Sequence, residues 1–93
     1  MTFNKDVLAR TEKAGFDFFI SDLDLAMTLA RIASDSQEDS EKRERNQANA
    51  RQAYDTISRI SARAVLSDKE RQEVKEKLNQ LKSALERLGE VFS

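Results

Sequence analysis

The last third of the chain carries one row of large apolar side chains at helical spacing. The row steps by four and three residues in turn, and the positions between its members are mostly polar. Such steps place the apolar side chains along one side of an α-helix, which then buries that side. We therefore predict a helix over residues 68–89, held by burial of Val74, Leu78, Leu81, Leu85, Leu88 and Phe92.

Residues 16–33 predict a helix that is apolar around most of its circumference. Phe16, Phe18 and Phe19 point in different directions on such a helix. Its polar side chains form one narrow stripe at steps of four and three, namely Asp17, Ser21, Asp24, Thr28, Arg31 and Asp35. A helix of this kind must be covered on more than one side, so we expect it to occupy the centre of a bundle.

Residues 37–64 predict a helix whose character changes along its length. The part from Gln37 to Gln47 contains no apolar residue, so we expect it to project beyond the core or to fray. The remainder carries a row of small and apolar side chains that lets a neighbouring helix approach closely. The members of this row are Ala50, Ala53, Tyr54, Ile57, Ile60, Ser61 and Ala64.

Capping residues mark the boundaries between these helices, because the chain contains no proline and only two glycines. Ser67 and Glu70 have the spacing of a capping box, in which each side chain accepts a hydrogen bond from the other residue's backbone. Ser34 or Ser36 is the expected N-cap of the preceding helix.

Gly15 leaves two possibilities for the beginning of the chain. We predict a short helix over residues 4–13 with Gly15 as its left-handed terminator. The alternative is one helix that continues through Gly15, at a cost of about 1 kcal/mol relative to alanine. The fold class that follows is all-α: an antiparallel three-helix bundle with a short additional N-terminal helix, in a single domain of residues 1–93.

The composition removes several classes of function. The 93 residues include no histidine and no cysteine, the side chains that most readily supply acid–base or nucleophilic groups near neutral pH. We therefore predict a protein that is not an enzyme, with no catalytic, cofactor-binding or metal-ligating residues. The net charge of −1 argues against nucleic acid as a partner. No apolar stretch resembles a signal peptide or a membrane span, so we expect a cytoplasmic protein without membrane contact.

Three carboxylates of the first long helix are the remaining candidates for chemistry. Asp17 and Asp24 lie on one face with Ser21 between them, which suits a solvated stripe better than a magnesium site or an acid–base pair. Asp22 is unusual because its neighbours are apolar. It either pairs with an arginine of the next helix or borders a functional groove.

Two surfaces are candidates for binding other molecules. On the first long helix, Phe18 shares a side with Leu25, Leu29 and Ile32, which pack either in the core or against another molecule, a second copy included. On the second, Arg51, Arg59 and Arg63 form a basic face for an acidic protein or nucleic acid. We expect an interaction or self-association module with an unknown protein partner, and a regulator acting through the basic face as the alternative.

Small and large apolar residues alternate in the two middle helices, as in Ala26, Ala30 and Ala33. This pattern resembles the antiparallel helix pairs of tetratricopeptide type, and the size and outline resemble the microtubule-interacting and transport domain. The chain is also similar to short uncharacterised bacterial helical proteins with Ala-Tyr-Asp-Thr, here residues 53–56, in a middle helix. These resemblances imply a helical fold and no particular activity.

Overall fold

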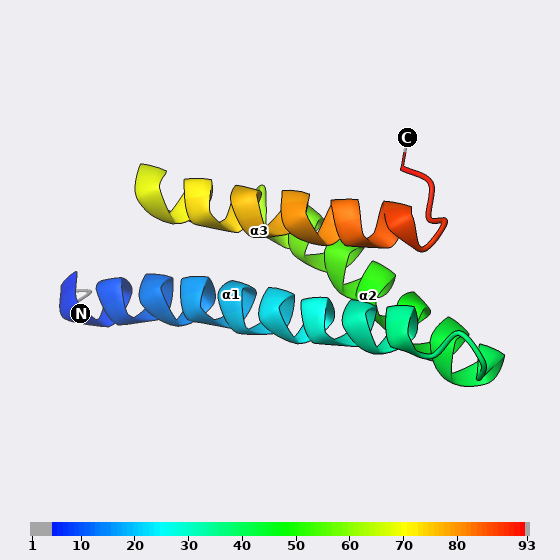
Figure 1. Ribbon diagram of the computed structural model, residues 1–93. Coiled ribbons are helices and arrows are strands. Elements are labelled where there is room, and N and C mark those ends of the chain that lie inside the picture. The colour runs from blue at the N-terminus through cyan, green and yellow to red at the C-terminus, as the bar shows by residue number, and fades with distance from the viewer. Residues whose placement is uncertain (1–4, 93) are drawn as a thin grey trace.

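The computed structural model describes the backbone of residues 5–92 and the side chains of residues 15–92. Within that range the chain forms three α-helices and no strand: α1 (Lys5–Asp35), α2 (Ser40–Ser61) and α3 (Asp68–Arg87). Figure 1 shows α1 and α3 running side by side with α2 behind them. α1 packs against both other helices, and most extensively against α2. The three-helix bundle is confirmed.

α1 continues through Gly15 without interruption, so the structure does not show the predicted separate helix over residues 4–13. The first residue of that prediction lies outside the described residues. Among the described residues a positive φ occurs at Gly89 and not at Gly15, so Gly15 does not terminate a helix. Continuing the helix adds a hydrogen bond for each residue, which offsets a glycine cost of about 1 kcal/mol.

The turn between α1 and α2 uses a different cap from the one predicted. The carboxylate of Asp39 accepts a hydrogen bond from the backbone N–H of Lys42 at 3.0 Å and caps α2. The Ser36 hydroxyl instead donates to the carbonyl of Ile32 at 2.6 Å, so it serves the end of α1. α2 therefore begins at Ser40, later than the predicted residue 37, and its first two turns are helical but contain no buried side chain.

α3 has both of its ends fixed by local hydrogen bonds. The predicted capping box is confirmed: the Ser67 N–H donates to Glu70 Oε1 at 2.9 Å, and the Glu70 N–H donates to Ser67 Oγ at 3.1 Å. At the other end Gly89 has φ +100°, and the N–H groups of Gly89 and Glu90 donate to the carbonyls of Glu86 and Leu85, both at 3.0 Å. These two bonds form a Schellman motif, which ends the helix at Arg87 and turns residues 88–92 back.

The core combines small side chains from α1 and α2 with large ones from α3. The predicted apolar row of α3 is confirmed, since Val74, Leu81 and Leu85 are buried and its other members are half-buried. The buried positions of α1 and α2 include four alanines at 3% exposure or less, which bring the two backbones close together: Ala26, Ala30, Ala33 and Ala50. The predicted polar stripe of α1 is exposed along its whole length.

Close approach, and not ion pairing, joins α1 to α2. Within residues 15–92 no acidic side chain of α1 forms an ion pair with a basic residue of α2. The ion pair that α1 makes there is to α3, from Asp24 to Lys77 at 2.6 Å. Along the described part of the chain, each helix is too short or too polar to cross a membrane.

Candidate functional site

Two large apolar side chains in the middle of α1 remain exposed to solvent. Phe18 and Leu25 are each 56% exposed. They lie seven residues apart, so they point to the same side of the helix, and Ile32 follows at the same interval. Leu29 and Ile32 are half-buried, and Leu29 packs against the core. We call Phe18, Leu25, Leu29 and Ile32 the α1 apolar surface; the core covers its second half better than its first.

Asp22 lies between the two exposed members of this surface. It follows Phe18 by four residues and precedes Leu25 by three, which places all three side chains on one side of α1. Asp22 is half-buried, and it forms no ion pair or side-chain hydrogen bond with any residue in the range 15–92. The predicted pairing with an arginine of the next helix is therefore wrong, and the carboxylate borders an open surface.

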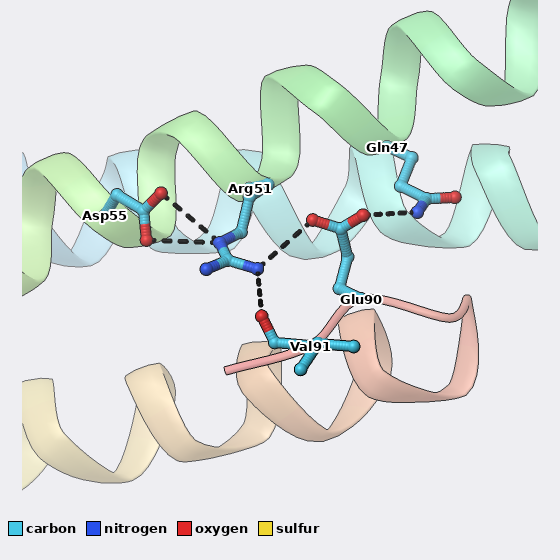
Figure 2. Close-up of polar contacts among 5 residues, drawn as sticks. All are labelled: Gln47, Arg51, Asp55, Glu90 and Val91. Carbon is cyan, nitrogen blue, oxygen red and sulfur yellow. Dashed lines mark hydrogen bonds and ion pairs between the residues drawn. The ribbon is translucent and has the colours of Figure 1, made fainter. Parts of the chain in front are cut away.

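The basic residues predicted to form one face of α2 are divided between two surroundings. Arg51 points toward α3 and the segment that follows it (Figure 2). Arg59 and Arg63 are exposed; the first lies in the last turn of α2 and the second just after the helix ends. The structure thus keeps two arginines available to solvent and removes the third from the predicted face.

Arg51 holds the segment after α3 against α2. Its Nη1 donates to Glu90 Oε1 at 3.2 Å and to the Val91 carbonyl at 2.9 Å, while its Nε donates to both carboxylate oxygens of Asp55 at 3.2 Å (Figure 2). Gln47 donates to the other oxygen of Glu90 at 2.7 Å. The guanidinium also lies 4.0 Å from the centre of the Phe92 ring. We call these contacts the Arg51 clamp.

The charges around Arg51 determine what this region can bind. Partial desolvation lowers the pKa of Arg51, but the hydrogen bonds and charges of Asp55 and Glu90 outweigh it, so the net pKa is raised. An open cavity of about 520 Å³ lies beside the clamp, and Arg51 is the basic residue of its lining, next to Glu44, Asp55 and Glu90. Because Nε and Nη1 already donate to two carboxylates and a backbone carbonyl, and the two carboxylates neutralise the guanidinium, Arg51 is a poor receptor for a phosphate or an acidic side chain.

Sequence reasoning identified Arg51 and a local pairing of Asp55, but it missed the distant partners of Arg51. Glu90 and Val91 lie 39 and 40 residues away along the chain, and no local pattern relates them to α2. Phe92 was predicted as the end of the buried row, and the structure adds an edge-to-face contact with Tyr54 at 4.9 Å between ring centres. The one signal available was Gly89, whose place after the last leucine indicates a reversal of the chain.

The carboxylates considered for chemistry do not converge. Asp24 binds Lys77, and Asp17 is exposed on the polar stripe of α1. Within the described residues no three acidic side chains lie close enough together to hold a metal ion.

Comparisons of the chain with protein-family models, with curated proteins and with solved structures found no match.

Proposed function

We propose that this protein is a non-enzymatic interaction module, and that the first half of the α1 apolar surface is where it contacts a protein partner. The observation that carries the proposal is the exposure of Phe18 and Leu25, 56% each, on either side of a carboxylate without a partner among residues 15–92. Single exposed apolar residues are common, but aligned ones on a helix otherwise rich in buried side chains are typical of interaction sites.

The basic face of α2 is the weaker candidate when taken alone. One of its three arginines is bound by Asp55 and Glu90, so it offers two exposed charges, Arg59 and Arg63. Two charges give little affinity for a nucleic acid backbone, which is normally bound through many more. The absence of histidine and cysteine from the sequence supports a role in binding over one in turnover.

Site-specific photo-cross-linking tests the proposal. A benzophenone amino acid replaces Phe18 in one variant and Gln80, an exposed residue of α3, in a matched control. After irradiation in native lysate, we expect discrete protein adducts with the reporter at position 18 and none at position 80. The same pattern at both positions would show that α1 has no preferred contact.

A further inference from the structure

We infer that the partner of the α1 apolar surface is an acidic amphipathic helix; this inference rests on the proposed function. It comes from the side of the molecule that α3 leaves open, where an apolar row of α1 and a basic row of α2 face the same way. Neither row alone specifies a partner. Together they form a surface that is apolar along one edge and basic along the other.

Contacts to α3 and to the segment that follows it, residues 88–92, show which flank of α1 and which flank of α2 is covered. Asp24 of α1 bonds Lys77, and Arg51 of α2 bonds Glu90 and Val91. At 100° per residue, Phe18 and Leu25 fall on the other flank of the buried row of α1, away from Asp24. These two side chains therefore point to the side of the α1–α2 pair that α3 does not cover.

The same reasoning applies to α2. Its buried positions Ala50 and Ile57 lie between Arg51 on one flank and Arg63 on the other. Arg45 and Arg59 are fourteen residues apart, about four helical turns, so both point outward on that second side; both are exposed, as is Arg63. Ile60, which is 42% exposed, lies between this basic row and the core.

The two rows run side by side because α1 and α2 are antiparallel and joined by a short turn. Counting equal distances back from Ser36 and Asp39 brings Phe18 level with Ile57 along the helix axes, and Arg59 is about 3 Å farther along α2. A helix lying along this surface would place apolar side chains, one every seven residues, against Phe18 and Leu25. Its neighbouring flank would then face Arg45, Arg59 and Arg63.

Charge complementarity selects the chemistry of that flank. The basic row presents three exposed arginines. They attract glutamate or aspartate on the facing side of a partner helix and repel lysine or arginine there. An anionic membrane would also be attracted to arginine. Asp22, however, lies within the apolar edge, where it would repel anionic headgroups across a broad surface but leaves a narrow helix room to pass.

A pair of synthetic peptides tests the inference with the purified full chain. Both are amphipathic helices with leucines seven residues apart and alanine elsewhere; one carries glutamates on a single flank and the other carries lysines there. We expect the glutamate peptide to bind at least about tenfold more tightly by fluorescence anisotropy, as expected for a few rim charges, and to bind less tightly as salt rises.

Variants locate the binding. Phe18→Ser and the double variant Arg59→Glu/Arg63→Glu each replace exposed side chains. Both should lower the affinity for the glutamate peptide by about tenfold. Arg87→Glu, at an exposed position of α3, is the matched control and should leave binding unchanged. Unaltered helicity by circular dichroism establishes that each variant folds.

The other outcomes overturn the inference. Tighter binding of the lysine peptide, no binding of either peptide, or binding of the glutamate peptide that survives both surface variants would each show that this surface does not select acidic helices. Stronger retention on duplex DNA or on phosphatidylserine vesicles would assign it a different partner class. If adducts still form at position 18 in lysate while the peptides fail, the proposed function stands and only the partner chemistry is wrong.

Discussion

Replacing Leu81 or Leu25 by alanine removes the same atoms from two different surroundings. Leu81 is 0% exposed in the core, whereas Leu25 is 56% exposed on the α1 apolar surface. Truncating a buried leucine costs about 2–5 kcal/mol, because lost burial and the cavity left behind add together. Less than half of Leu25 is shielded from water, so its truncation should cost less than about 1 kcal/mol.

Urea unfolding followed by far-UV circular dichroism measures both effects. For Leu81→Ala we expect a fall in the free energy of unfolding of about 3 kcal/mol with an unchanged m-value, and a loss of about 12–24 °C in Tm. The two substitutions are matched in helix propensity, since both replace leucine by alanine within a helix. A dilute sample ensures that no second molecule covers Leu25.

Equal losses in the two variants would refute this reasoning. They would show that Leu25 is shielded in the folded monomer, and the exposed surface on which the proposed function depends would not exist. A small loss for Leu81→Ala alone would instead show that the apolar row of α3 does not hold that helix in place.

Three further substitutions test the remaining contacts. Arg51→Ala should speed amide hydrogen exchange in residues 88–92, because it opens the Arg51 clamp, while Arg59→Ala should leave that exchange unchanged; equal exchange in both would contradict the clamp. Ser67→Ala should lower the free energy of unfolding by about 1 kcal/mol because it removes the capping box. The control Ser83→Ala, at an exposed serine of the same helix, should lower it by less than about 0.5 kcal/mol. An unchanged stability for Ser67→Ala would mean that water replaces the hydrogen bonds of the capping box. Gly89→Ala should lower the free energy of unfolding by about 1–2 kcal/mol because φ is +100° at Gly89. Gly15→Ala, whose added Cβ meets nothing within 4 Å, should raise it by about 0.5–1 kcal/mol. If thermal melts showed a change of the same sign for both variants, the left-handed backbone at Gly89 and the helical backbone at Gly15 would be contradicted.

The features predicted correctly from the sequence are those determined by neighbouring residues. The row from Val74 to Phe92 lies on one helix, so its spacing alone defines a buried side. The box at Ser67 and Glu70 closes within four residues. The polar stripe of α1 is likewise a property of one helix, and all three predictions agree with the structure.

Competition between similar residues explains the boundary that was predicted wrongly. Ser34, Ser36 and Asp39 all carry side-chain acceptors near the start of α2, and their intrinsic preferences as caps are similar. Ser36 instead donates to the last turn of α1, which leaves the capping position to Asp39. Gly15 is a comparable case, since its small helical cost is too low to decide between stopping and continuing.

The candidate site was less predictable because it depends on contacts between distant residues. A helix that is apolar on most sides does not indicate which sides its neighbours will cover, so Leu23 and Leu25 are equivalent in the sequence. The structure buries Leu23 to 1% exposure and leaves Leu25 at 56%. In the same way, nothing near Arg51 reveals that Glu90 will neutralise it, and so the basic face lost one member.

The four buried alanines between α1 and α2 limit how this protein can change. With only a methyl group at each contact, the two backbones themselves set the distance between the helices. A valine at Ala26 or Ala50 would have no space to occupy and would have to push the helices apart. The larger side chain would also increase the distance between Leu25 and Arg59. A substitution in the buried contact between α1 and α2 would therefore alter binding at the exposed surface of the same two helices.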